Sequence, residues 1–231
     1  MSYTLHIANK NYSSWSLRPW ALMRALNIPF TERLHRLGVT GEFRSFSPSG
    51  RVPCLEDGTT VVWDSLAIVE YLAERHAGVW PADPQARAWA RCACAEMHSG
   101  FAALRNQHGM NVGVRVAVSK RSTAVEADIA RIVELWQQGL ARFGGPFLAG
   151  REFCAVDAFF APVAFRFRSY GVAMNGATAG YLETMLAHPA MQEWETAALA
   201  EDFRETEHEA ELANAGTVTA DLRAVSPAPT L

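Results

Sequence analysis

The chain has 231 residues, of which 49% are hydrophobic and 19% are charged, and its formal net charge is −3. This is the composition of a globular protein with a substantial core, in one large domain or two small ones. A mildly acidic chain lacks the positive field that nucleic-acid binding requires, so we expect no nucleic-acid partner. No apolar run approaches the ~18–20 residues of a membrane span, and the N-terminus lacks the pattern of a secretory signal. We therefore expect a cytoplasmic protein with no membrane partner.

The first third of the chain alternates between strand and helix patterns. Two short β-rich runs, VPCLED and TTVVW, are joined by Asp57-Gly58, and this dipeptide between apolar runs predicts a hairpin. The polar run GEFRSFSPSG before them is expected to be irregular with a short helix. The predicted order is β-α-β-(α)-β-β-α, with a strand at 3–8, a helix at 16–27, a strand after Pro29 and a helix at 64–77.

After a linker with two prolines, VWPADPQA, strand patterns nearly vanish. The second half is predicted to be all-helical, with helices at 86–106, 124–143, 154–171 and within 177–201. The polar tail from about residue 213 is expected to be poorly ordered. The expected domains are therefore 1–78 and 86–212, with 213–231 as the tail.

The four cysteines do not form a metal-binding pattern. Cys92 and Cys94 stand two apart in a helical run and point in different directions, and Cys54 and Cys154 lie far from them in the sequence. Zinc sites need ligand spacings that are absent here. We expect reduced, mostly buried thiols and no metal.

Several spaced motifs resemble the glutathione S-transferase family. RVPCLEDG resembles the segment with the family's cis-proline, WDSLAIVEYL resembles its Ser-x-Ala-Ile helix motif, and SSWSLR resembles the N-terminal motif of serine-type members. The last is closest to the zeta-class Ser-Ser-Cys-Ser-Trp-Arg, and the helical segments EMHSGFAALRN and FLAGREFCAVDAFFAP resemble those of bacterial members. The resemblance implies an α/β thioredoxin-like N-terminal domain, an all-α C-terminal domain, and glutathione as a substrate.

The resemblance also implies a glutathione site. Val52 and Pro53 would pair with the central cysteine of the tripeptide, and Arg51 would bind its glycine carboxylate, in preference to the other candidates Arg36, Arg44 and His35. Ser65 would bind the γ-glutamyl carboxylate, and Asp64 its amino group. The residues independently predict Ser65 as the N-cap of a helix, whose first N–H groups attract an anion.

Ser13 and Ser14 are the candidate catalytic residues. Because proline is tolerated only in the first turn of a helix, Pro19 predicts a helix that starts near Trp15 or Ser16, with both serines in the loop ahead of it. A hydroxyl there, together with the helix dipole, can stabilise a thiolate. Alignment with the family motif favours Ser13, with Ser14 as a second donor. Tyr12 is the rival, since other classes use a tyrosine near this point.

A pocket for the second substrate is expected between the two domains. Its candidate residues are Trp15, Met97, His98, Phe101 and Arg105, the last four at helical spacing. Core packing is the competing interpretation for Phe101, and an exposed polar face for His98. Trp15 replaces the cysteine of the zeta motif and would narrow this pocket, which argues against the zeta isomerisation reaction.

The favoured hypothesis is a glutathione transferase that adds the glutathione thiolate to a small apolar electrophile, in detoxification. One alternative is a glutathione-dependent cis-trans isomerase of the maleylacetoacetate type. Another is a non-catalytic binding protein with the same fold. The family further implies a homodimer.

Overall fold

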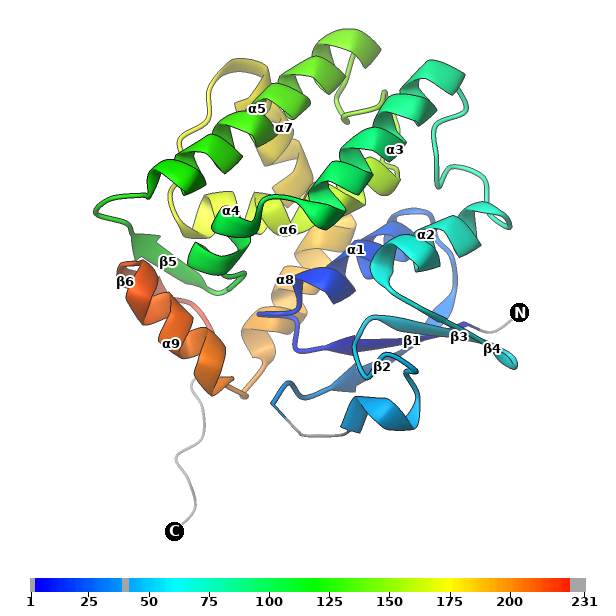
Figure 1. The fold of residues 1–231 in the computed structure, drawn as a ribbon, viewed down its shortest axis with the longest axis horizontal. Helices are drawn as coiled ribbons and strands as arrows, with labels where there is room; N and C mark the ends of the chain where they lie inside the picture. Colours follow the sequence, from blue (N-terminus) through cyan, green and yellow to red (C-terminus); the bar gives the residue numbers. More distant parts are fainter. Residues whose placement is uncertain (1–2, 39–41, 225–231) are drawn as a thin grey trace.

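Residues 3–73 form a four-stranded mixed sheet with helices on one side (Figure 1). We call this part of the chain the sheet half, and the part from residue 84 onward the helical half. In the computed structural model, which describes residues 3–38 and 42–224, the strand order is β2-β1-β3-β4. β1 pairs in parallel with β2 and antiparallel with β3, and β4 completes the hairpin with β3. The strands are β1 (Tyr3–Ala8), β2 (Phe30–His35), β3 (Cys54–Asp57) and β4 (Thr60–Trp63). The predicted strands and hairpin are thereby confirmed.

Helices α1 (Ser14–Ala25) and α2 (Ser65–Ala73) lie between this sheet and the helical half of the molecule (Figure 1). A short 3-10 helix, η1 (Glu42–Ser45), occupies the connection between β2 and β3, as the irregular sequence predicted. The order β-α-β-(α)-β-β-α is therefore confirmed. Both helices bury the side that faces the sheet, with Leu17, Ile68 and Val69 fully buried.

Helix α1 begins earlier than Pro19 suggested. Its first residue is Ser14, and Pro19 lies inside the helix, beyond the first turn. The premise that proline is confined to the first turn was therefore wrong here. All eight residues from Ser16 to Met23 are buried, so packing offsets the hydrogen bond that the proline cannot make.

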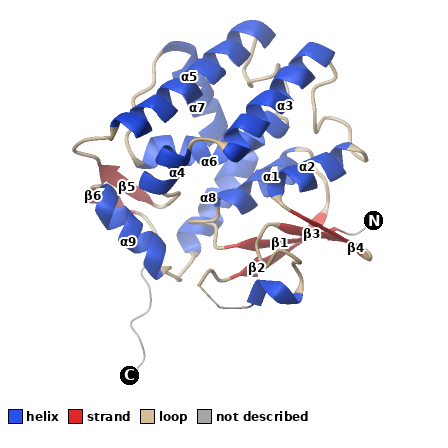
Figure 2. Cartoon of the chain, in the orientation of Figure 1, coloured by secondary structure: helices blue, strands red, loops and turns tan. Residues whose placement is uncertain are grey.

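The second half of the chain is mainly a helical bundle (Figure 2). Helix α6 is its central element: nearly every one of its residues is buried, and it packs against α1, α3 and α7. None of the helices in the described ranges is long and apolar enough to cross a membrane. The helices are α3 (Pro84–Ser99), α4 (Ala102–Gln107), α5 (Thr123–Phe143), α6 (Ala155–Ser169), α7 (Gly176–Ala187), α8 (Pro189–Ala200) and α9 (Thr206–Ala215).

The single helix predicted for 86–106 is two helices, α3 and α4. The chain turns at Gly100 and at Phe101, which has a left-handed backbone with φ of 56°. A Cβ on Gly100 would lie 2.8 Å from the Glu96 carbonyl oxygen, so only glycine fits this break. After the break, α4 packs against α5 and α9.

The second half differs from the prediction in two details: it contains two short strands beside its helices, and residues 213–224 include the end of α9 and a strand. Strands β5 (Val114–Ala117) and β6 (Thr217–Asp221) pair antiparallel and pack on α9 and α6. The alternation in VGVRVAV buries Val114 and Val116 on one side, a period-2 pattern that we had overlooked. Arg223 then anchors the segment through bidentate pairs with Glu209 and Asp221. The last seven residues of the expected tail, 225–231, lie outside the described residues.

The start of α6 depends on a buried carboxylate. Asp157 accepts hydrogen bonds from the backbone N–H groups of Cys154 and Leu148, each at 3.0 Å, and from the Tyr181 hydroxyl at 3.1 Å. Asp157 thus reaches back to the backbone of the N-cap residue, as the acidic residue of a capping box does. Burial raises the pKa of this carboxyl to about 6.

Replacing Asp157 should therefore destabilise the whole fold. Asp157→Ala leaves three buried donors unpaired, and we expect it to lower the free energy of unfolding by about 3 kcal/mol or more. Urea denaturation at a pH above 7, where the carboxyl is ionised, measures this. Asp83→Ala is the matched control, because Asp83 is an exposed N-cap of α3 with one hydrogen bond, to the Ala86 N–H. That change should cost about 1 kcal/mol, and equal losses in the two variants would contradict the expectation.

Candidate functional site

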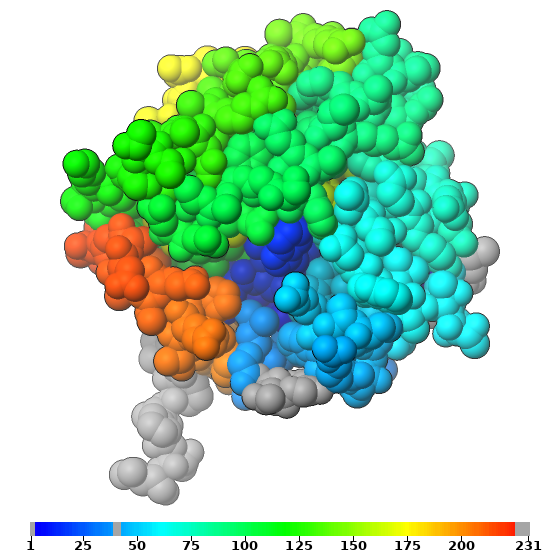
Figure 3. All heavy atoms as spheres, viewed as in Figure 1, coloured from blue at the N-terminus to red at the C-terminus, as the bar shows by residue number. Residues whose placement is uncertain are grey.

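Two adjoining cavities lie where the sheet half meets the helical half. The space-filling view shows the deep-blue N-terminal segment at the bottom of a hollow between the green, cyan and orange parts of the chain (Figure 3). We call the first the serine cavity, of about 370 Å³, and the second the proline cavity, of about 420 Å³. They share Trp15, Arg51, Val52 and Arg105 along their common border. A ligand can thus extend from one cavity into the other.

The two cavities have different linings. The serine cavity is lined by Tyr12, Ser13, Ser14, Trp15, Leu37, Phe43, Gly50, Arg51, Val52, Arg105, Asn106, Gly109, Met110, Arg166, His208 and Glu211. The proline cavity is lined by Trp15, Ser49, Arg51, Val52, Pro53, Trp63, Asp64, Ser65, His98 and Arg105.

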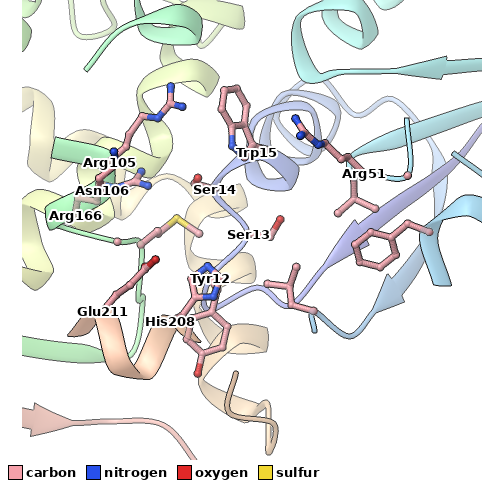
Figure 4. Close-up of a pocket in the computed structure, with 16 residues that line it drawn as sticks. Tyr12, Ser13, Ser14, Trp15, Arg51, Arg105, Asn106, Arg166, His208 and Glu211 are labelled. Atoms are coloured by element: carbon pink, nitrogen blue, oxygen red, sulfur yellow. The ribbon is translucent and has the colours of Figure 1, made fainter. Parts of the chain in front are cut away.

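Ser13 and Ser14 lie in the middle of the serine cavity, between Arg51 on one side and Arg105 and Arg166 on the other (Figure 4). Ser13 is the N-cap residue of α1, and Ser14 is its first residue. This corrects the expectation that both precede the helix.

The hydroxyls of these two serines differ in their partners. The Ser13 hydroxyl donates to the Ser16 hydroxyl oxygen at 2.7 Å, and Ser16 also accepts the Ala8 N–H at 3.2 Å. The Ser14 hydroxyl has no hydrogen-bond partner among the described residues. In Figure 4 the Ser13 hydroxyl points to the side of Arg51, where the proline cavity begins. Ser16 thus fixes Ser13 toward the border between the cavities.

Tyr12 uses its hydroxyl for structure. The phenol donates to the Glu209 carboxylate at 2.7 Å, and Arg223 lies 3.2 Å from its oxygen. Burial, followed by the hydrogen bond with Glu209, raises the pKa of Tyr12 well above its usual value. Its proton is therefore committed to the contact that joins the loop before α1 to the C-terminal segment.

The proline cavity contains a buried hydroxyl without a partner. The N-cap of α2 is Asp64, whose carboxylate accepts the Leu66 N–H at 2.8 Å, and not Ser65 as expected. Ser65 is instead the first helical residue, 1% exposed, and its hydroxyl oxygen has no hydrogen-bond partner in the part of the chain that the structure describes. A buried polar group at a helix N-terminus facing a cavity is suited to an anionic ligand. Beside it, the Val52–Pro53 peptide bond is cis, as expected.

His98 closes the proline cavity on the side of the helical half. Its Nε2 lies 3.5 Å from the Asp64 carboxylate, and its ring meets Trp15 edge-on at 5.2 Å. Burial lowers the pKa of His98 despite the nearby Asp64. The imidazole is therefore neutral at pH 7, and its contact with Asp64 is not a full ion pair.

Trp15 forms the border between the cavities and is held between two cations. The guanidinium of Arg18 lies 4.1 Å from the ring centre and that of Arg105 lies 4.7 Å from it. Arg18 is buried, its Nε and Nη1 have no hydrogen-bond partner among the described residues, and it forms no ion pair with an acid there. Burial, and then repulsion from Arg166 and Arg105, lowers the pKa of Arg18 to about 9.

Arg51 is exposed and lines both cavities, and it forms no ion pair within the described residues. The alternatives to it are occupied elsewhere. Arg44 donates to the Pro48 carbonyl, His35 contacts His6, and Arg36 lies 3.8 Å from Asp202. None of the three lines either cavity.

The structure brings together most of the residues chosen from the sequence. Trp15, His98 and Arg105 line the cavities, whereas Met97 and Phe101 do not: both are buried in the core, so their assignment to the pocket was wrong. Sequence reasoning missed other polar lining residues, among them Arg166, His208 and Glu211. Arg166 had a signal, because it is a charged residue directly after the apolar run FFAPVAF.

Metal binding has no support in the described ranges. No group of three or more His, Cys, Asp or Glu side chains there could hold a metal ion. Cys54, Cys94 and Cys154 are buried, and Cys92 is exposed on α3.

Two family models match the sequence. The N-terminal domain of glutathione S-transferase matches residues 12–75, and the C-terminal domain of glutathione S-transferase matches residues 119–197. A zeta-class glutathione S-transferase from Euphorbia esula is 31% identical over 126 residues, which are 53% of this chain and 56% of that protein. The match therefore spans little more than half of that relative. A stringent starvation protein A homolog from Pasteurella multocida is 25% identical over 151 residues, 64% of this chain and 68% of that protein.

Solved structures share the fold. A glutathione transferase homolog from Burkholderia with bound glutathione has a TM-score of 0.64 at 23% identity, over 85% of this chain and 97% of that one. Ure2p in complex with glutathione has a TM-score of 0.63 at 20% identity, over 83% and 96% of the chains. The two family models together match more than half of the sequence, in the order of the two structural halves. The chain belongs to the glutathione S-transferase family, with a thioredoxin-like N-terminal domain and a helical C-terminal domain.

Proposed function

We propose that the protein is a glutathione transferase that binds glutathione across the two cavities and adds its thiolate to an electrophile in the serine cavity. The observation that carries this proposal is the buried, unpartnered hydroxyl of Ser65, which shares a continuous hollow with Ser13. The proline cavity, with Ser65, can bind an anionic end of the tripeptide, and the serine cavity, with Ser13, can hold its sulfur.

The proline cavity offers a complement to each polar part of glutathione. Ser65 and the first N–H groups of α2 bind the γ-glutamyl carboxylate, and the Asp64 carboxylate binds the amino group. The Val52 backbone, next to the cis Pro53, pairs with the cysteinyl backbone. Arg51, at the border of the two cavities, binds the glycine carboxylate. This arrangement extends the peptide toward the serine cavity.

The N-terminus of α1 activates the sulfur. A free cysteine thiol has a pKa near 8.5, and a helix N-terminus with hydrogen-bond donors lowers it. When glutathione binds, the Ser13 hydroxyl turns its proton from the Ser16 oxygen to the thiolate, and Ser16 positions Ser13 by donating its own hydroxyl proton back to the Ser13 oxygen. Ser14 is the second donor. With an aryl chloride as the electrophile, the thiolate forms the S–C bond and the C–Cl bond breaks, so that chloride leaves with the electron pair. The thiol proton has already passed to solvent.

The isomerase alternative begins from the same thiolate. The zeta-class relative supports it, whereas Trp15, which stands where the zeta motif has cysteine, argues against it. A non-catalytic protein that binds glutathione is the third possibility. Assembly as a homodimer, a role in detoxification and a cytoplasmic location stay predictions.

Ser13→Ala should raise the pKa of the bound glutathione thiol by about one unit or more, since it removes a donor to the thiolate. A pH titration of the thiolate ultraviolet absorbance of the complex measures this. Ser14→Ala is the matched control and should shift the midpoint less. If only Ser14→Ala raises the midpoint, then Ser14 holds the thiolate and the choice of Ser13 is wrong.

Tyr12→Phe should leave the pKa of the bound thiol unchanged, because its hydroxyl is already bonded to Glu209. It should lower the free energy of unfolding by about 1–2 kcal/mol, since the buried Glu209 contact is lost. The same absorbance titration, together with urea denaturation, checks both effects. A raised thiol pKa would make Tyr12 the catalytic donor.

Ser65→Ala should weaken glutathione binding about 10-fold or more without changing the pKa of the bound thiol, because Ser65 contacts the other end of the tripeptide. Calorimetric titration with glutathione measures the affinity. Ser99→Ala is the control, as its hydroxyl bonds the Ala95 carbonyl outside both cavities. No binding of glutathione by the unmodified protein would exclude all three functions.

A further inference from the structure

The serine cavity has a buried cation on its far wall. Arg166 of α6 lines the cavity and is only 4% exposed. Its guanidinium donates to the His108 carbonyl at 2.9 Å and to the Pro162 carbonyl at 3.5 Å, and no carboxylate in the described part of the chain bonds it. Burying a guanidinium without a counter-ion is costly. The cavity beside Arg166 is the place where an anion could compensate its charge.

Arg105 adds a second cation to this wall. Its Nη1 donates to the carbonyls of His98 and Gly100, both at 3.2 Å, and its guanidinium stacks on Trp15. These carbonyls belong to the C-terminal end of α3 and carry only partial negative charge. Arg105 is therefore held in position without being neutralised.

The charges around the cavity do not balance. Arg51, Arg105 and Arg166 line it, whereas Glu211 is the one carboxylate among its lining residues, and it forms no ion pair with them in the described structure. Arg105 and Arg166 also repel the guanidinium of Arg18, which packs on Trp15, and both lower the pKa of Arg18. The empty cavity thus has a positive potential that a bound anion would offset.

Glutathione does not account for Arg166. Both glutathione carboxylates are assigned above to Ser65 and Arg51, and Ser65 lines only the proline cavity. Arg166 lines only the serine cavity, on the opposite side of Ser13 from Arg51 (Figure 4). The thiolate, the third anionic group of bound glutathione, is assigned to Ser13, so we assign an anion at Arg166 to the second substrate.

We propose that the second substrate is a small electrophile bearing a carboxylate, which Arg166 and Arg105 bind while its reacting carbon faces Ser13. This inference rests on the proposed transferase function and replaces the wholly apolar electrophile expected from the sequence. A carboxylate pairs with guanidinium donors through charge-assisted hydrogen bonds, and the Asn106 side chain, which lines the same wall, is a further polar contact. Phe43 and Met110 supply apolar surface for the rest of such a molecule.

The experiment compares two electrophiles with the same reacting carbon, para-chloro-meta-nitrobenzoate and its methyl ester. We expect the unmodified protein to have a KM for the acid at least ~10-fold below that for the ester. Arg166→Met should raise the KM for the acid ~10- to 100-fold and leave the KM for the ester and for glutathione unchanged. Arg115→Met is the matched control, because Arg115 also bonds only carbonyls, those of Val112 and Val114, and lines neither cavity.

Equal KM values for the acid and the ester, or equal losses with both in Arg166→Met, would overturn the inference. If neither compound is conjugated, the proposed transferase function fails, and a binding measurement then tests whether Arg166 forms an anion site. Calorimetric titration of benzoate and of benzamide into protein saturated with S-methylglutathione provides this test. Selective binding of benzoate that Arg166→Met abolishes and Arg166→Lys retains in part supports the anion site. Equal binding of the two compounds overturns it.

Discussion

The burial of helix α1 between the sheet and helix α6 is the contact on which the rest of the site depends. α1 belongs to the first half of the chain, yet it packs closely against α6 and α8 of the second half. Trp20, fully buried, meets Trp194 of α8 edge-on at 5.0 Å, and Arg18 lies over Phe159 of α6. Because α1 is fixed in this way, its N-terminus opens at the junction of the two halves. The serines of this turn therefore line the serine cavity, and the adjacent Trp15 borders both cavities.

Much of the sheet half was predictable because its patterns are local. The strands follow short apolar runs, and the hairpin follows Asp57-Gly58. The position of the α1 N-terminus was predictable only approximately. Pro19 seemed to require a later start, but a helix that is buried on nearly all sides can include a proline in its interior. Sequence rules for helix ends assume that local backbone preferences determine where a helix starts, whereas tertiary packing determines the start of α1.

The parts of the site that were missed come from contacts between residues distant in the sequence. Glu211 and His208 lie on α9, which reaches the serine cavity because Tyr12, Glu209 and Arg223 tie the C-terminal segment to the loop before α1. A polar segment after residue 206 has no local feature that predicts such a connection. Met97 and Phe101 were misplaced for the opposite reason. Helical spacing placed both on one side of a single helix, whereas α3 ends at Ser99 and both side chains are buried in the core.

The break between α3 and α4 links the fold to the charge of the serine cavity. An uninterrupted helix would satisfy its own carbonyls, whereas the break at Gly100 leaves carbonyl groups at the end of α3 that need donors. Arg105 supplies them, and Arg166 does the same for His108 at the end of α4. Each arginine thereby satisfies a helix end and keeps its full positive charge at the cavity wall. The ends of two successive helices thus fix two cations in place, and a rigidly held cation binds an anion without the entropic cost of ordering a free side chain.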